Sequence, residues 1–260
     1  MKIASWNVNS LKVRLPQVLD WIILNRPDVL CLQETKQNND NFPHDIFKKN
    51  GLFSYHNGQN TYNGVAIISN KELTDVQLDI PKFHDEQKRL ISGIYTNSNG
   101  FNQRIFSAYV PNGQALNSEK FEYKIKWLKS FLNFLQTQTS DTANIIPGDF
   151  NIAPSKLDCY ESKSWGEKIL TSPQERAYFN KFLETGFIDT FRKINPNEIQ
   201  FSWWDYRIPF KRNLGMRIDH ILLSNKLLPF LKKAYIDNST RSLERPSDHV
   251  PIVTELDLNS

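Results

Sequence analysis

The sequence predicts an α/β fold in which two mixed β-sheets pack face to face with the helices outside. Short apolar segments with the length of strands are numerous, whereas segments with helical periodicity are few and spaced apart. The N-terminal segments form a strand–helix–strand unit, which alone would favour one doubly wound parallel sheet. Candidate hairpins after residue 64 argue against that fold, because strands joined by short turns pair antiparallel.

The N-terminal unit places two polar residues at one edge of a sheet. Residues 2–9 are expected to form a short strand, and apolar residues recur at helical spacing from about residue 11 to residue 25. A second strand at 28–33 delivers Glu34 to its carboxyl end. Because the carboxyl ends of parallel strands meet at the same edge, Asn7 and Glu34 are expected to lie together.

The middle of the chain is predicted to contain a hairpin and the longest helix. Residues 97–100 have the sequence of a tight turn between two apolar strands. The expected segments are a polar connection at 36–49, strands at 64–69, 73–80, 90–95 and 105–110, and an amphipathic helix at 118–136 whose polar face carries Lys120, Lys124, Lys126 and Lys129.

Residues 143–147 are expected to form a buried strand that leads into a polar loop. Pro147 cannot donate a ladder hydrogen bond, so the strand should end there or lie at the edge of its sheet. Gly148 permits a tight turn, after which Asp149 and Asn151 can point the same way. A carboxylate beside an amide suits Mg²⁺ or Mn²⁺. Taken alone, the stretch is better explained as an Asx-rich turn, so the site depends on partners elsewhere.

The C-terminal part alternates short strands with irregular segments. We find no internal repeat or flexible linker in the sequence, so residues 1–258 are expected to form a single domain. The expected segments are an irregular stretch at 154–166, a helix at 172–184 with proline at its first position, a short mixed segment at 187–193, an aromatic pair at 203–204 followed by a basic loop, and strands at 216–223, 234–237 and 250–256.

Composition restricts the class of protein without naming a function. Thirty-two Lys and Arg against 28 Asp and Glu give a net charge of +4, which permits a polyanionic partner without requiring one. Two cysteines, Cys31 and Cys159, give neither a disulfide framework nor a zinc spacing, so a reducing compartment is expected. The sequence has no recognisable signal peptide or transmembrane run, so we expect a soluble, cytoplasmic protein.

Polar side chains suited to catalysis follow apolar strands at several points, where rigid scaffolds place such residues. Each has an ordinary alternative: Glu34 alone is more often a solvated carboxylate, and Tyr109 a half-buried aromatic with a wet hydroxyl. Asp219 inside an apolar strand needs a partner, and His249 could be that partner. The full set is Asn7, Glu34, Tyr109, Asp149 with Asn151, Asp219, and Asp248 with His249.

Together these residues indicate metal-assisted hydrolysis of a phosphodiester. Glu34 and Asp149 can hold a divalent cation, and His249 and Tyr109 can donate hydrogen bonds to phosphoryl oxygens. The set lacks a Ser or Cys nucleophile with its base, and we find no Gly-rich phosphate loop. The other ligand side chains in reach are those of Asn7, Asn151 and Asp248.

The pair Trp203-Trp204 lies near several cations. Exposed tryptophan beside Arg and Lys suits sugar or base stacking and phosphate contacts. Without the metal cluster, a buried Trp pair beside a basic surface loop is equally consistent with the sequence. The cations are Arg207, Lys211, Arg212 and Arg217.

Nine short motifs occur in order along the chain. They are Ser5-Trp6-Asn7-Val8-Asn9-Ser10, Leu32-Gln33-Glu34-Thr35-Lys36, Gly64-Val65-Ala66, Tyr109-Val110-Pro111-Asn112-Gly113, Gly148-Asp149-Phe150-Asn151-Ile152-Ala153-Pro154, Asp189-Thr190-Phe191-Arg192, Phe201-Ser202-Trp203-Trp204-Asp205-Tyr206-Arg207, Arg217-Ile218-Asp219 and Pro246-Ser247-Asp248-His249. With these motifs the chain, from Lys2 to about Leu256, resembles the exonuclease III family of bacterial AP endonucleases, within the endonuclease/exonuclease/phosphatase superfamily.

The resemblance implies a four-layer α-β-β-α sandwich with the site at one end of the paired sheets. It implies cleavage of the DNA backbone 5′ to an abasic site, leaving a 3′-hydroxyl, with Mg²⁺ as cofactor and Mn²⁺ able to substitute. Digestion from 3′ ends and removal of 3′ blocking groups often accompany this activity. The implied partner is double-stranded DNA with abasic sites or 3′ ends. We expect a monomer that acts in base excision repair, with no membrane partner, in a bacterial cytoplasm and on the nucleoid when bound to DNA.

The resemblance also implies ligands for the metal and the water. Glu34 resembles the main metal ligand, supported by Asn7, and Asp248 lies at a second metal position. Asp149 resembles the residue that activates the attacking water, and Asn151 the amide that orients it. The possible metal ligands are Asn7, Glu34, Asp149, Asn151, Asp248 and His249.

The remaining implied roles concern the DNA. Tyr109 resembles the phenol next to the scissile phosphate, and His249 the imidazole on that phosphate, with Asp219 behind it. The positions that match substrate contacts are Trp203, Met216 and Ile218 for an apolar pocket that receives the extruded abasic sugar, and Arg89 and Asn112 for backbone phosphates.

Two other functions stay open. A superfamily phosphodiesterase or phosphatase acting on lipid or inositol phosphates would share the metal site, although the cations near Trp203 speak against it. A non-catalytic nucleic-acid binder would have lost metal ligands, yet every proposed ligand is present.

The chain departs from the family pattern at Pro147, where a small or apolar residue is common before Gly-Asp. This departure affects the expected geometry of the strand and leaves the metal ligands unchanged. The loops at 36–49 and 207–214 leave the balance between endonuclease and exonuclease open.

Overall fold

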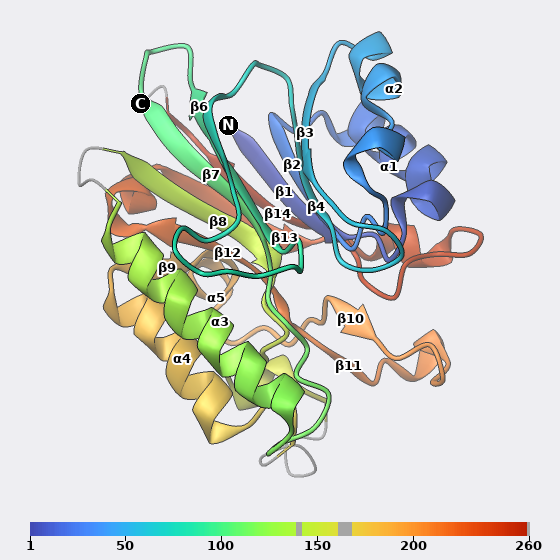
Figure 1. Cartoon of the computed structure of the whole chain (residues 1–260). Helices are drawn as coiled ribbons and strands as arrows, with labels where there is room; N and C mark the ends of the chain where they lie inside the picture. Colours follow the sequence, from blue (N-terminus) through green and yellow to red (C-terminus); the bar gives the residue numbers. More distant parts are fainter. Residues whose placement is uncertain (139–141, 161–167, 259–260) are drawn as a thin grey trace.

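The structure, a computed structural model, describes residues 1–138, 142–160 and 168–258 (Figure 1). Two six-stranded sheets pack face to face, and helices cover both outer faces, which confirms the predicted four-layer fold. A separate ribbon of β10 (Trp203–Trp204) and β11 (Gly215–Met216) lies beyond one end of the sheets. Among the described residues, no helix is long and apolar enough to cross a bilayer.

The first sheet contains both ends of the chain. Its strand order is β13-β14-β1-β2-β4-β3, in which β1 and β2 run parallel and the other neighbours antiparallel. Helix α1 (Leu11–Asn25) connects the parallel pair, as predicted, and α2 (His44–Lys49) follows β2. The strands are β1 (Lys2–Asn7), β2 (Val29–Gln33), β3 (Phe53–Asn57), β4 (Val65–Ser69), β13 (Leu231–Ile236) and β14 (Ile252–Leu256).

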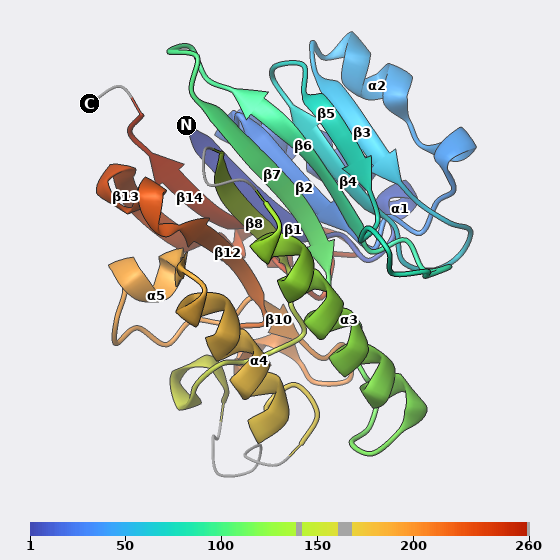
Figure 2. The same ribbon diagram turned by 60° about the vertical axis from the view of Figure 1, so that its left-hand side comes forward.

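The second sheet has the strand order β5-β6-β7-β8-β12-β9, and β7 and β8 are its parallel pair. The predicted hairpin is confirmed, because β6 and β7 pair antiparallel on either side of the turn. Figure 2 shows α3 (Glu119–Gln136) and α4 (Pro173–Glu184) side by side outside this sheet, with the short α5 (Thr190–Ile194) beyond them. The strands are β5 (Thr74–Leu78), β6 (Leu90–Thr96), β7 (Asn102–Tyr109), β8 (Ala143–Asp149), β9 (Phe187–Asp189) and β12 (Asp219–Ser224).

Three apolar layers hold the four structural layers together. Successive side chains of a strand point to opposite faces, so β8 sends Ile145 between the sheets and Ile146 toward the helices. In the same way, β1 sends Ile3 between the sheets and Trp6 toward α1. Both faces of these strands are therefore buried, which explains why their sequences are apolar without alternation.

Two features between residues 36 and 57 differ from the sequence prediction. The polar connection expected at 36–49 contains α2, whose Phe47 is fully buried against the first sheet. Strand β3 was not predicted, because it is an edge strand of polar and aromatic residues, and even its buried side chains, His56 and Asn57, are polar. Of the irregular stretch predicted at 154–166, residues 161–167 lie outside the described residues.

The prediction that β8 ends at Pro147 or lies at a sheet edge is wrong. Strand β8 continues to Asp149 and is flanked by β7 and β12. Pairing with β12 runs through Pro147, which lies opposite Ile221. On its other side, β8 pairs with β7 at Ile145 and at Gly148. Within the described chain, the two residues between them have no pairing partner on β7. This local gap in the ladder accommodates a residue that has no N–H to donate.

Candidate active site

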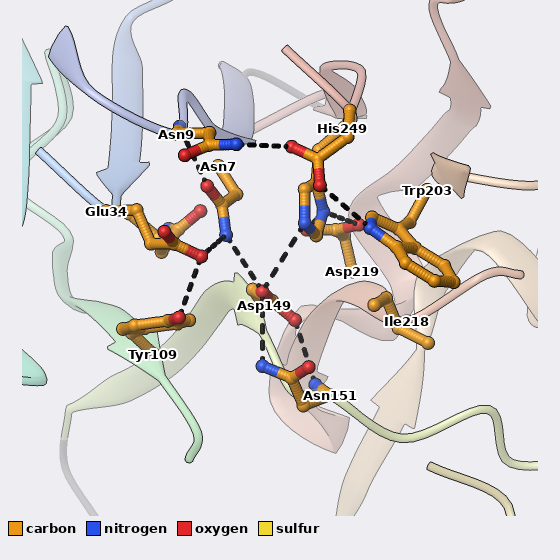
Figure 3. Close-up of polar contacts among 12 residues, drawn as sticks. Asn7, Asn9, Glu34, Tyr109, Asp149, Asn151, Trp203, Ile218, Asp219 and His249 are labelled. Atoms are coloured by element: carbon orange, nitrogen blue, oxygen red, sulfur yellow. Dashed lines mark hydrogen bonds and ion pairs between the residues drawn. The ribbon is translucent and has the colours of Figure 1, made fainter. Parts of the chain in front are cut away.

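The candidate site lies at one edge of the two packed sheets (Figure 3). Strands β1, β2, β7 and β8 bring their carboxyl ends to this edge. Strands β12 and β14 run antiparallel to β8 and β1, so their first residues arrive at the same edge. The side chains brought together from these strands are Asn7, Glu34, Tyr109, Asp149, Asn151, Asp219, Asp248 and His249.

Glu34 is held by three hydrogen-bond donors. Its Oε1 accepts from Asn7 Nδ2 at 3.0 Å and from the Tyr109 hydroxyl at 2.7 Å, and Lys36 Nζ lies 2.9 Å from Oε2. Burial raises the pKa of Glu34, but the Lys36 charge and the hydrogen bonds from Asn7 and Tyr109 outweigh it and hold the pKa below its usual value. The carboxylate is therefore anionic at neutral pH, as a cation ligand must be.

Tyr109 stays a hydrogen-bond donor. Burial and the neighbouring charge of Glu34 raise the pKa of Tyr109 well above its ordinary value, so the phenol keeps its proton at neutral pH. The guanidinium of Arg89 lies 4.6 Å from the centre of the Tyr109 ring. Gln87 Oε1 accepts from Arg89 Nε at 2.9 Å and from Nη2 at 2.7 Å. Arg89 therefore packs on the phenol in this conformation.

Asp149 joins the two halves of the site, as Figure 3 shows. Its Oδ2 accepts from Asn7 Nδ2 at 2.9 Å and from Asn151 Nδ2 at 3.3 Å, and its Oδ1 from the Asn151 backbone N–H at 2.9 Å. Burial and the charge of Asp219 raise the pKa of Asp149 to about 7, against the opposing charge of His249. A carboxylate whose pKa lies near neutrality can both accept and release a proton under working conditions.

Asp219 and His249 form a hydrogen-bonded pair, as the sequence predicted. His249 Nδ1 donates to Asp219 Oδ2 at 2.9 Å, and Ser202 Oγ donates to the same oxygen. Burial lowers the pKa of His249, but the charges of Asp219 and Asp149 outweigh burial and raise it to about 10. The imidazole is therefore a cation, and its Nε2 lies 3.8 Å from Asp149 Oδ2.

Asp248 and Trp203 form the rim of the site. Asp248 Oδ1 accepts from Asn9 Nδ2 at 3.0 Å, and Oδ2 accepts from Trp203 Nε1 at 3.0 Å. The Trp203 ring is partly exposed, with its centre 6.5 Å from that of the His249 ring. In this conformation Asp248 positions the indole, and a second metal position there would compete with these two hydrogen bonds.

The three residues expected to form an apolar pocket lie together, but two of them are covered. Met216 has no exposed surface, and Ile218 is 2% exposed. Both pack in one cluster with Leu170, Ala153 and Cys159, and Ile169 lies against its side. Of the three, Trp203 therefore offers the accessible apolar surface, and deeper entry of a sugar would require this cluster to rearrange.

A cavity of about 510 Å³ opens beside the candidate site rather than over it. Arg89 and Asn112, the two expected phosphate contacts, both line it, and Asn112 is exposed. Asn112 Nδ2 also donates to Asn151 Oδ1 at 3.0 Å, which links the cavity wall to the site. The cavity wall also contains Gln59, Tyr62, Asn63, Gln87, Lys120 and Tyr123.

Sequence reasoning missed three polar partners and misplaced a fourth. Lys36 pairs with Glu34, Asn9 donates to Asp248, and Ser202 donates to Asp219, and no spacing rule indicated these contacts. Lys124 was assigned to the polar face of its helix, and this was wrong, because it is fully buried. Its position in the sequence already indicated burial, because Lys124 follows Phe121 by three residues and therefore lies on the apolar face of the helix.

The side chains present fit a hard divalent cation. Asp149, Asp219 and His249 each place a ligand atom within 4.8 Å of the others. A protonated imidazole cannot coordinate, so in that trio only the carboxylates are available. Glu34 and Asp149 form a second pair of carboxylates, since both accept from the single Asn7 Nδ2. Oxygen ligands of this kind favour Mg²⁺ or Mn²⁺ over zinc.

Comparisons with known proteins agree with this geometry. Residues 4–249 match the endonuclease/exonuclease/phosphatase family. Exodeoxyribonuclease III of Haemophilus influenzae is 36% identical, over 98% of this chain and 99% of the relative. Among solved structures, the 3′ phosphatase NExo from Neisseria, bound to a product DNA hairpin, is 43% identical with a TM-score of 0.94, and 99% of each chain is covered. An AP endonuclease from Archaeoglobus fulgidus is 35% identical with a TM-score of 0.93, over 99% of this chain and all of the other.

Proposed function

The chain belongs to the endonuclease/exonuclease/phosphatase family, and on that premise we propose that it is a metal-dependent DNA repair nuclease of the exonuclease III type. The observation that carries the proposal is the position of Asp149. This buried carboxylate is linked through Asn7 to Glu34 on one side and faces the His249–Asp219 pair on the other. A site with an anionic ligand, a base and a cationic donor is suited to phosphodiester hydrolysis.

Asp149 accepts a proton from the attacking water. The Asn151 backbone N–H holds one carboxylate oxygen, and the Asn151 side-chain amide lies against the other, where it can also orient the water. The proton moves from the water oxygen to Asp149, whose pKa of about 7 lets it take the proton and release it later. Asn112 fixes the Asn151 amide by donating to its oxygen.

His249 stabilises charge on the phosphate. Its Nε2–H can donate to a non-bridging phosphoryl oxygen, and Asp219 at Nδ1 keeps the ring protonated and correctly oriented. Glu34 and Asn7 would hold the cation, which we propose to be Mg²⁺. Asn7 presents its amide nitrogen to both carboxylates, so direct ligation through its oxygen would require the amide to rotate. When bound, Mg²⁺ neutralises the phosphate and stabilises the leaving oxygen.

We propose two substrates, duplex DNA with an abasic site and duplex DNA with a blocked or extendable 3′ end. An abasic nucleotide has lost stacking and pairing, so extruding it toward Trp203 costs little. A second observation favours 3′ ends: Met216 and Ile218 are covered, so a terminal nucleotide that needs no deep pocket fits this conformation directly. The similar structure of a 3′ phosphatase is consistent with that candidate.

Three matched duplexes test the function, one with a stable abasic analogue, one with a 3′-phosphate and one blunt and intact. We expect incision or 3′-processing with Mg²⁺, loss of both in EDTA and recovery when Mg²⁺ is restored. Equal internal incision of the abasic and the intact duplex would contradict specificity for the abasic site, and activity in EDTA would contradict the metal.

Asp149→Asn keeps the shape and removes the base. Because positioned acid–base groups contribute about 10²–10⁴-fold, we expect loss of at least about 10³-fold in kcat with DNA binding retained. Lost binding would instead give Asp149 a structural role. Binding is measured by fluorescence anisotropy of the same duplexes in EDTA.

A further inference from the structure

Lys124 is a fully buried cation on the helix that packs behind the site. It lies on α3 within the face that buries Phe121 and Leu128. Its Nζ donates to the Asn151 carbonyl oxygen at 2.7 Å, to the Asn112 carbonyl oxygen at 3.2 Å and to Glu175 Oε1. An ammonium group has three N–H donors, and these contacts use all of them.

Glu175 is equally fixed at the start of α4. It has no exposed surface, and its Oε2 accepts from the Ser172 backbone N–H at 3.0 Å and from Ser172 Oγ at 2.6 Å. Its Oε1 accepts from the Leu170 backbone N–H at 3.0 Å as well as from Lys124. Both carboxylate oxygens are therefore saturated, and the pair holds Lys124 Nζ at one point behind the loops that follow β7 and β8.

Those two loops carry asparagines whose side chains meet in the site. Asn151 has a φ of 49°, in the left-handed region, so its backbone needs external support. Lys124 supplies it by binding the Asn151 carbonyl group, while the side chains of Asn112 and Asn151 bond to each other at 3.0 Å on the opposite side. One ammonium therefore ties both loops to the same helix.

Stability alone does not account for a charge at this position. A buried ion pair is often no more stabilising than apolar residues of the same volume, because both ions lose their hydration. What an apolar pair could not do is bind two carbonyl groups from the catalytic loops.

We propose that Lys124, clamped by Glu175, is a positioning residue that sets the Asn151 amide against Asp149 and the attacking water. The inference rests on the proposed nuclease function for its kinetic consequence. Misplacement of a catalytic group by a fraction of an ångström to 1 Å costs up to about 10²-fold in rate. Loss of Lys124 is therefore expected to lower kcat about 10–100-fold, with KM for DNA changed less than about threefold.

The test uses Lys124→Met together with the double variant Lys124→Met/Glu175→Met. The single variant leaves a buried carboxylate without its cation and is expected to lose stability. The double variant removes both charges and so avoids an unpaired buried ion, although the N–H groups of Leu170 and Ser172 lose their acceptor. It is expected to be more stable than the single variant and still show the reduced kcat. A folded double variant with wild-type kcat would overturn the proposal.

A mutant cycle with Asn151→Ala identifies the residue through which Lys124 acts. If Lys124 acts through Asn151, its loss should matter little once Asn151 is gone, because the effects of coupled positions are not additive. The triple variant, which carries Asn151→Ala together with the two methionines, is then expected to have a kcat less than about twofold below that of Asn151→Ala alone. Full additivity would refute this route. Ile68→Ala, which opens a gap in the distant cluster under α1, is the control for instability alone and is expected to keep wild-type kcat.

Hydrogen exchange separates this proposal from the function. In the double variant the amides of residues 110, 112, 113 and 150–153 are expected to exchange faster, with β1 and β2 unchanged, whether or not the protein cleaves DNA. Unchanged exchange in these loops would refute the positioning role. If the wild-type protein does not cleave DNA but the loops still exchange faster in the variant, the nuclease function is refuted and the positioning role of Lys124 is retained.

Discussion

Replacing Asp219 by asparagine removes one of the two carboxylates that keep His249 protonated while preserving size and a hydrogen-bond acceptor. In the native protein Nδ1 of His249 lies 2.9 Å from Asp219 Oδ2, and the pKa of the imidazole is raised from 6.5 to about 10. At 1.36 kcal/mol per pKa unit, this difference corresponds to about 5 kcal/mol in favour of the cation. Asp219 contributes more to it than Asp149 does.

Losing the larger contribution is expected to lower the pKa of His249. At pH 9, about nine tenths of the native imidazoles are protonated, and a smaller fraction is expected in the variant. Asp149 responds in the same direction, because the charge of Asp219 helps to raise its pKa to about 7. In the proposed mechanism activity requires ionised Asp149 and protonated His249, so both limbs of the pH profile are expected to move to lower pH.

The assay is kcat/KM on a duplex with a stable abasic analogue, from pH 6 to 10.5 at fixed, saturating Mg²⁺ for both proteins. Titration of ¹⁵N-labelled histidine in the metal-free protein measures the imidazole directly. The reasoning is refuted if the alkaline limb of Asp219→Asn stays near pH 10 and only the height of the profile falls. It is also refuted if the limb moves upward.

Three further changes test other parts of the structure. Glu34→Gln keeps the hydrogen-bond acceptor for Asn7 and removes the negative charge. The affinity for Mn²⁺, measured by calorimetry, should therefore fall roughly 100-fold while the protein stays folded. An unchanged affinity would mean that the cation binds elsewhere. Arg217→Met removes the arginine partner of Asp189 and leaves Asp158 paired with Arg192 alone, so urea unfolding at pH 7 should show a loss of about 3–5 kcal/mol. Burial raises the pKa of Asp189, but the Arg217 charge outweighs burial and holds that pKa far below its normal value. The native ion pair therefore contributes stability above about pH 4, and this contribution is lost as the pH falls. The difference in unfolding free energy between native protein and variant should shrink at pH 3, and a constant difference would contradict the pairing. Pro147→Ala should change the free energy of unfolding by less than about 1 kcal/mol, because the ladder already has a gap there, whereas a large change would mean that the ring itself is needed.

Elementary geometry was enough to predict the convergence of several site residues. Asn7 and Glu34 follow neighbouring parallel strands, and their side chains are hydrogen-bonded at 3.0 Å. Asp219 lies inside an apolar strand, so it needed a partner, and His249 is that partner. The reason lies in the first case in a strand–helix–strand unit, which makes the two strands parallel, and in the second in the cost of one buried charge, and both can be predicted from a short stretch of sequence.

Other features depended on packing that local sequence does not contain. Lys124 was placed on the polar face because residue type was given more weight than position, although its helical spacing indicated burial. Strand β3 has a weak apolar pattern because an edge strand buries little. Met216 was expected to line a pocket, but it is buried in a cluster that includes Leu170, which is 46 residues away in the sequence.

The position of β14 also affects how the protein is synthesised. This strand is translated after every other strand of the described chain, yet it lies between β13 and β1, the first strand to be made. The indole of Trp6 donates to the backbone carbonyl of His249 at 3.2 Å, so β1 completes its contacts only when residue 249 is present. A nascent chain on the ribosome has no imidazole beside Asp149 until this segment emerges. In the proposed mechanism, a chain released before residue 249 would therefore lack the group that stabilises charge on the phosphate.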